Sequence, residues 1–170
     1  MDGTVMVWDL EPLMDAQGAD TPAPPCLECI PSHPSGVTCI ELIDDAFLCT
    51  GGWDAEIRVH DLLATPPGTV PAGASRGEPL VLRGHSEFVR ALAGADGLLF
   101  SASNDRTVRV WDLHRGGSCI SLMTGHTLPV ICLAICEGLV FSAGYDFVIK
   151  ARAPCLPAAP CVRSQPHGKS

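Results

Sequence analysis

The sequence has few aromatic residues, little positive charge and no long hydrophobic run. Aromatic side chains make up 5% of its 170 residues, whereas glycine (17) and proline (15) are frequent. This composition favours many short strands joined by turns over a few long helices. Hydrophobic residues at 46% and charged residues at 18% argue against disorder, and the length suffices for one domain with a core.

The small number of basic residues limits the classes of partner. Lysine and arginine number 11 against 19 aspartates and glutamates, the net charge is -8, and the basic residues form no cluster. A surface for nucleic acid or for an anionic membrane needs concentrated positive charge. We therefore expect neither nucleic acid nor a membrane among the partners. No run of about 18 apolar residues is present, so no segment is expected to span a bilayer.

The N-terminal stretch MDGTVMVWDLEP has no basic segment followed by an apolar core, so no secretory signal is expected. The nine cysteines are an odd number and fit no complete disulfide framework. Reduced thiols are typical of the cytosol and the nucleus. The expected localisation is therefore cytoplasmic, with the nucleus as a second possibility.

The chain repeats itself. Four segments align without gaps: MDGTVMVWDL (1–10), GWDAEIRVHDL (52–62), SNDRTVRVWDL (103–113) and GYDFVIKARAP (144–154). Their aligned aspartates are Asp2, Asp54, Asp105 and Asp146, at spacings of 52, 51 and 41 residues. Six residues after each aspartate come, in order, Trp8, His60, Trp111 and Arg152. Upstream of the last three aspartates, SHPSGVTCI, GHSEFVRAL and GHTLPVICL align on His33, His85 and His126. Repeats of about 40–50 residues indicate a stacked or radial architecture.

This Gly-His, gap, Trp-Asp pattern resembles the WD-repeat family over residues 1–152. The resemblance implies an all-β fold, namely a segment of a β-propeller with four antiparallel strands in each blade. The repeats near 1–10, 33–62, 85–113 and 126–152 would supply about three to four blades of an incomplete ring. Two inserts at 11–26 and 63–79 are expected as exposed loops. Residues 153–170 are expected as an irregular, proline-rich tail.

The family pattern implies a hydrogen-bonded network in each repeat. Tryptophan bonds a serine or threonine on the preceding strand, that hydroxyl bonds the histidine, and the histidine bonds the turn aspartate. The third repeat has the full set in His85, Ser101 (or Ser103), Asp105 and Trp111. The second keeps His33, Thr50 and Asp54 but has His60 in place of tryptophan. The fourth keeps His126, Ser142 and Asp146 but has Arg152 there.

Histidine, serine and aspartate in bonding order also resemble a catalytic triad. An enzyme needs one such site, whereas this trio recurs in successive repeats, so a structural role is favoured. We therefore expect no catalytic residues and no cofactor. Cys26, Cys29 and His33 have a zinc-like spacing, but a structural site needs four ligands, and no metal is expected. The cysteines placed in strands are expected as small core residues: Cys39, Cys49, Cys119, Cys132 and Cys136.

The face made by the Gly-His loops and aspartate turns is the expected partner surface. In the family, contacts often use the residue before the turn aspartate and the start of the first strand. Those positions hold Trp53, Phe88, Arg90, Asn104 and Tyr145, a composition typical of binding hot spots. The alternative is that Trp53 and Phe88 pack locally over neighbouring turns.

The expected function is a non-catalytic scaffold or adaptor that binds other proteins. The alternative is a regulatory or targeting segment of a larger enzyme, such as a ubiquitin-ligase substrate receptor or a WD-repeat domain associated with a kinase or GTPase. The stretch VWDLHR approaches the Trp-Asp-x-Arg ending of such receptors, but His114 holds the arginine position and Arg115 comes one residue late. An open arc exposes sheet faces. We therefore expect a fragment or short isoform of a longer WD-repeat protein, with self-association as a way to complete the ring.

Overall fold

The computed structural model describes residues 3–10, 24–64, 66, 68–69 and 77–153, and this part of the chain is all-β. The first sheet pairs β1 (Thr4–Trp8) with β2 (Cys26–Pro31). The second holds β3 (Val37–Ile43), β4 (Phe47–Gly52), β5 (Ile57–Asp61) and β6 (Leu80–Leu82). The third holds β7 (Val89–Ala95), β8 (Leu98–Ser103), β9 (Val108–Asp112) and β10 (Ser118–Met123). The fourth holds β11 (Val130–Cys136), β12 (Leu139–Gly144) and β13 (Ile149–Arg152). A short 3-10 helix, Leu113–Arg115, joins β9 to β10.

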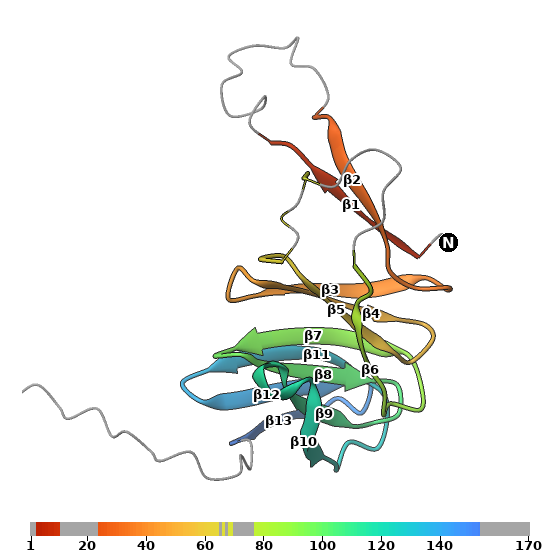
Figure 1. Cartoon of the computed structure of the whole chain (residues 1–170). Helices are drawn as coiled ribbons and strands as arrows, with labels where there is room; N and C mark the ends of the chain where they lie inside the picture. Colours follow the sequence, from red (N-terminus) through yellow and green to blue (C-terminus); the bar gives the residue numbers. More distant parts are fainter. Residues whose placement is uncertain (1–2, 11–23, 65, 67, 70–76, 154–170) are drawn as a thin grey trace, which may run out of the picture.

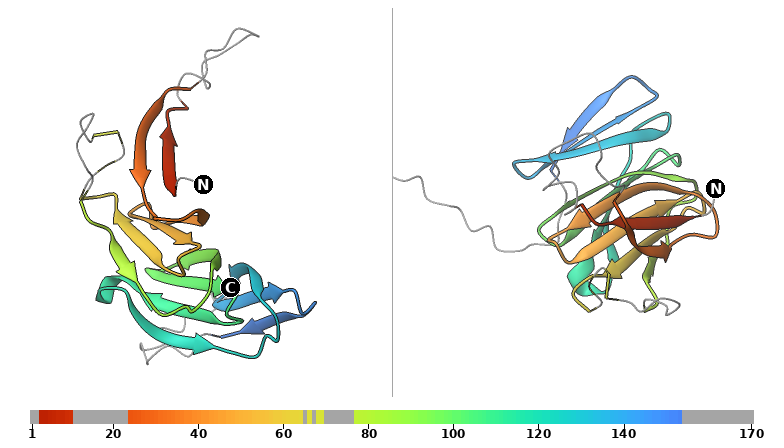
Figure 2. Two further views of the ribbon diagram at one scale, coloured as in Figure 1. Left: turned by 90° about the vertical axis from the view of Figure 1, so that its right-hand side faces the viewer. Right: turned by 90° about the horizontal axis from the view of Figure 1, so that it is seen from above.

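The sheets follow one another in a curved row. Each is an antiparallel meander in which neighbouring strands of the sequence pair. The innermost strand of the third sheet, β7, lies beside the innermost strands β3 and β11 of the sheets on either side (Figure 1). The described residues form an open arc and not a closed ring (Figure 2). This confirms the predicted fold class of an incomplete propeller segment.

The aspartate turns explain why the strands end and reverse where they do. The Asp54 and Asp105 carboxylates each accept a hydrogen bond from the backbone N–H two residues later, at 3.2 Å and 3.0 Å. The Asp146 carboxylate does the same at 3.3 Å. Such a local bond mimics a backbone turn. It holds the residue after each of these three aspartates in the left-handed region: Ala55 (φ 63°), Arg106 (φ 70°) and Phe147 (φ 60°).

The core lies between the sheets. One cluster of buried residues joins the second and third sheets and includes Ile43, Leu92, Leu99 and Trp111. At its edge the sheets approach so closely that a Cβ on Gly94 would collide with Ile43. A second cluster, built on Phe100, Val110 and Val140, joins the third and fourth sheets. Packing of sheet against sheet therefore stabilises the middle of the arc.

The two ends of the arc are less covered than its middle. The prediction that the cysteines in strands lie in the core is right for Cys49, which is buried, and half right for Cys39, which is half-buried. It is wrong for Cys119, Cys132 and Cys136, which are exposed. Cys132 and Cys136 alternate on the face of β11 that points away from the third sheet, where no described sheet covers them. Cys119 lies on the outermost strand of its own sheet.

Several predicted features fall mainly outside the described residues. These are the turn at Asp2, most of the two inserts and the tail from residue 154 onward. Within the described ranges, no helix is long and apolar enough to cross a membrane.

Candidate functional site

The third repeat contains a four-membered hydrogen-bonded network. With its ring proton on Nδ1, His85 donates to Asp105 Oδ2 at 2.7 Å. The Nε2 atom of the same ring accepts from the Ser101 hydroxyl at 2.7 Å. The Trp111 indole N–H donates to Ser101 Oγ at 2.8 Å. Ser103, the alternative serine, instead donates to the Glu87 carbonyl at 2.9 Å, so Ser101 is the network member.

The second and fourth repeats bring together the same three partners without tryptophan. His33 Nδ1 lies 2.9 Å from Asp54 Oδ1, and its Nε2 lies 3.0 Å from Thr50 Oγ1. In the fourth repeat His126 Nδ1 lies 2.8 Å from Asp146 Oδ2. Its Nε2 lies 2.9 Å from Ser142 Oγ. The structure therefore joins all the sequence-predicted network residues within their own repeats.

The position held by Trp111 in the third repeat differs in each of the others. His60 occupies it in the second repeat, where the ring is buried and its Nε2 lies 3.3 Å from Ser32 Oγ, on the chain leading from the first sheet. Arg152 occupies it in the fourth repeat and is exposed. A buried polar ring and an exposed arginine thus stand where the third repeat has a buried indole.

The network favours the charged form of Asp105 and of Asp146. Burial alone would raise the pKa of Asp105, but hydrogen bonds from His85 and Thr107 stabilise the carboxylate and hold its pKa well below the ordinary range. In the fourth repeat burial also opposes ionisation of Asp146. Hydrogen bonds from His126 and from the Thr127 and Val148 amides lower the pKa of Asp146 nonetheless.

The distances in the third repeat match those of a catalytic triad, but the burial does not. Ser101 is fully buried, and its oxygen already accepts the Trp111 N–H. A nucleophile needs access to a substrate and an open position next to its oxygen. The network therefore satisfies buried polar groups and fixes the turn.

The possible zinc ligands are not assembled into a site. The Cys26 and Cys29 sulfurs lie 3.7 Å apart on β2. The His33 ring is held by Asp54 and Thr50 instead. Among the described residues, no group of three or more histidine, cysteine or acidic side chains could hold a metal ion.

Equivalent backbone bonds place the predicted partner residues on one face. The N–H groups of Trp53, Asn104 and Tyr145 donate to the carbonyls of Gly36, Phe88 and Pro129, at 3.0 Å, 2.9 Å and 3.0 Å. Each bond ties the residue before a turn aspartate to the start of the first strand of its sheet. Because the bond repeats, the three side chains hold equivalent positions on the same rim of successive sheets.

The aromatic residues on this face are in contact. The Trp53 and Phe88 rings stack with centroids 5.4 Å apart and an interplanar angle of 16°, which bridges the second and third repeats. Trp53 nevertheless remains 43% exposed, and Tyr145 is exposed as well. Arg90 Nε donates to Asn104 Oδ1 at 2.7 Å. Phe88, Arg90 and Asn104 are half-buried, so the structure combines local packing with an exposed aromatic surface.

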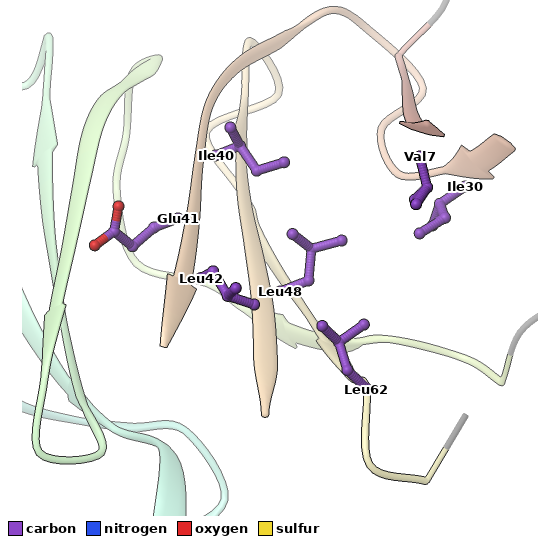
Figure 3. Close-up of a pocket in the computed structure, with 7 residues that line it drawn as sticks. All are labelled: Val7, Ile30, Ile40, Glu41, Leu42, Leu48 and Leu62. Carbon is purple, nitrogen blue, oxygen red and sulfur yellow. The ribbon is translucent and has the colours of Figure 1, made fainter. Parts of the chain in front are cut away.

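An apolar groove of about 360 Å³ that the sequence did not reveal lies between the first and second sheets (Figure 3). It is lined by Val7, Ile30, Ile40, Glu41, Leu42, Leu48 and Leu62. Ile40 and Leu42 alternate on β3 and are exposed, whereas Glu41 between them accepts from the Gly94 N–H of the third sheet at 3.1 Å. The alternation of Ile40 and Leu42 in the sequence indicates an apolar face of a strand. Whether another sheet covers that face depends on how the sheets are arranged, which the sequence does not show.

Comparisons with known proteins agree with this geometry. Residues 24–61 and 78–112 match the family described as WD domain, G-beta repeat. The chain is 45% identical over 68 residues to nuclear distribution protein PAC1 of Yarrowia lipolytica, covering 38% of this chain and 16% of that protein. It is 38% identical over 100 residues to cell division control protein 4 of Saccharomyces cerevisiae, covering 58% of this chain and 11% of that protein.

Among solved structures, the chain resembles the computationally designed Ika4 protein. The TM-score is 0.67 at 27% sequence identity, and the match covers 89% of this chain and 80% of that one. The chain thus spans less than a fifth of the length of these two curated relatives but most of the designed Ika4 protein.

Proposed function

The chain belongs to the WD40-repeat family, whose domains generally act as protein-interaction modules, and we propose that it is a non-catalytic scaffold or adaptor that binds other proteins through the rim carrying Trp53, Phe88, Arg90, Asn104 and Tyr145. The cytoplasm, or the nucleus, is the compartment where it would act.

The Trp53–Phe88 stack is the observation that carries this proposal. A ring held against another ring loses little conformational freedom on binding, because it is already ordered. Trp53 still presents nearly half of its surface to solvent, and a hydrogen bond to Asn104 holds the Arg90 guanidinium. Tryptophan, tyrosine and arginine are the residues enriched at the centres of protein interfaces.

The proposal is tested by capture of partners with a matched control. The double variant Trp53→Ala/Arg90→Ala removes the exposed ring and the guanidinium. The control, Leu122→Ala, removes an exposed apolar side chain from the outer strand β10. We expect the double variant to lose the specific partners of the wild-type chain in quantitative mass spectrometry and the control to keep them. If the double variant kept every partner, the proposal would be wrong.

A second candidate function is that of a regulatory or targeting segment of a larger enzyme. Its support is that the curated relatives are many times longer than the segment the chain matches. The 3-10 helix after β9 offers Arg115, which is largely exposed and 3.5 Å from Asp112, as a contact point for a catalytic subunit. Loss of one captured enzyme subunit in Arg115→Ala, with the rim intact, would favour this function.

A further inference from the structure

The first strand of the chain carries residues that the last sheet lacks. Counted from the turn aspartates, Val5, Val7 and Trp8 on β1 correspond to Val108, Val110 and Trp111 on β9. Val108, Val110 and Trp111 are all buried. The same positions on β13 hold Ile149, Ala151 and Arg152, which are exposed, and Ile149 is 74% exposed. β1 therefore matches the buried side chains of β9 more closely than β13 does, although β1 lies in the first sheet.

Trp8 and Ser142 form complementary halves of one network. Trp8 is 48% exposed on β1. Ser142 Oγ is engaged by His126 as Ser101 is by His85, but Arg152 stands where the indole donor would be. In the third sheet the equivalent oxygen accepts both groups. The fourth repeat thus has a place for one tryptophan, and the chain has one exposed tryptophan in the matching strand position.

We propose that the β1–β2 sheet of a second copy completes the β11–β12 pair, with β1 replacing β13 and Trp8 donating to Ser142 Oγ. β1 of the second copy then pairs with β12 in the register that β13 has in the single chain. Trp8 lies opposite Val140, as Arg152 does now, and Val7 lies opposite Phe141, as Ala151 does now. The result is a four-stranded sheet of the same order as the third sheet.

The groove between the first and second sheets fits the other side of this exchange. β11 brings with it its uncovered face of Cys132, Ala134 and Cys136, all small and exposed. These residues meet Ile40, Leu42 and Leu48 in the groove (Figure 3). The same contact already exists one sheet further along, where Ile43 of β3 packs against Gly94 of β7. By strand position, Cys136 corresponds to Ile43 and Leu42 corresponds to Gly94.

A reciprocal exchange between two copies closes the assembly. Each copy contributes two complete sheets and half of each of two composite sheets, which gives about six blades in a range of about four to eight. A pair related by a twofold axis has no remaining open end. This pairing leaves the proposed partner rim free and does not depend on it.

Light scattering on the full chain, with two reciprocal variants, tests the exchange. The wild type should have twice the chain mass of 17.9 kDa. Trp8→Arg should raise the dissociation constant of the dimer by roughly 30-fold, the size expected on loss of a buried interface tryptophan. Arg152→Trp should also weaken the dimer, because β13 then fills the Ser142 site in its own chain. A general loss of folding cannot explain the second result.

Oxidative cross-linking locates the contact. Within one chain β3 and β11 lie on opposite sides of β7, so a bond between residues 42 and 136 joins two copies (Figure 1). Leu42→Cys should give a covalent dimer through Cys136, and the control Leu42→Cys/Cys136→Ser should not. A monomer, an aggregate without defined mass, or a dimer that cross-links equally without Cys136 would overturn the proposal. Loss of captured partners with the dimer intact would bear on the rim alone.

Discussion

The third and fourth repeats share the same hydrogen-bonded trio but differ in how well the next strand is packed. His85, Ser101 and Asp105 are joined at 2.7 Å on both sides of the ring, and their fourth-repeat counterparts at 2.9 Å and 2.8 Å. After this turn, Trp111 is 2% exposed, whereas Ile149 is 74% exposed. The polar turn thus forms without the tryptophan. Burial of the third strand needs apolar residues and a neighbouring sheet.

The second repeat shows an intermediate solution. His60 replaces the tryptophan and is nevertheless buried, in contact with Ser32. A buried histidine ring can therefore occupy the position, because Ser32 gives its Nε2 atom a hydrogen-bond partner. The exposed Arg152 has no such surroundings, and its strand remains at the edge.

Alanine at the tryptophan position should give the largest difference between the two repeats. Trp111→Ala removes a buried ring and should lower the free energy of unfolding by about 3–5 kcal/mol. Arg152→Ala removes an exposed side chain and should change it by less than about 0.5 kcal/mol. Denaturant unfolding of the two variants measures both values. Equal losses of stability would show that Trp111 and Arg152 contribute equally to their repeats.

Removal of the network hydroxyl should give a smaller difference. Ser101→Ala leaves both the Trp111 N–H and the His85 Nε2 atom without a partner, so it should cost about 2–3 kcal/mol. Ser142→Ala removes a bond to His126 only and should cost about 1 kcal/mol. The same unfolding experiment measures these costs. A Ser142 variant as unstable as the Ser101 variant would mean that the two networks are equivalent.

Acid should weaken both repeats through their aspartates. The pKa of Asp105 is below that of an unfolded aspartate, so its contribution is present above about pH 4 and lost as pH falls through the folded pKa. Unfolding midpoints measured between pH 7 and pH 3 should fall less steeply in Asp105→Asn than in the wild type. A slope unchanged by this substitution would show that Asp105 binds protons equally in both states.

Relief of backbone strain should give the smallest effect. Phe147 has φ of 60° and is 98% exposed, so its side chain makes little contact that glycine would lose. Phe147→Gly should stabilise the fourth repeat by up to about 1 kcal/mol, because glycine adopts this conformation freely. Proteolysis rates near β13 would detect it. Faster cleavage in the variant would contradict the strain argument.

The sequence predicted the parts of the site that repeat. His85 and Asp105 lie a fixed distance apart in the chain, and their counterparts recur, so the network followed from alignment alone. The choice between Ser101 and Ser103 did not, because both lie on the same face of β8 and the choice depends on which of them comes level with His85 and Trp111. The exposure of Cys132 and Cys136 was missed because strand residues are covered only where a next sheet exists. The Trp53–Phe88 stack joins two repeats, so no pattern within one repeat could settle it.

Hydrogen exchange of the full chain, resolved to single strands, tests most directly the claim that the complete third repeat is the stable part and the fourth repeat is unfinished. The amides of β8 and β9 should exchange slowest and those of β13 at least about 100-fold faster, since an uncovered edge strand opens locally. Amides of β13 as slow as those of β9 would contradict it, because Arg152 would then close its strand as well as Trp111 does.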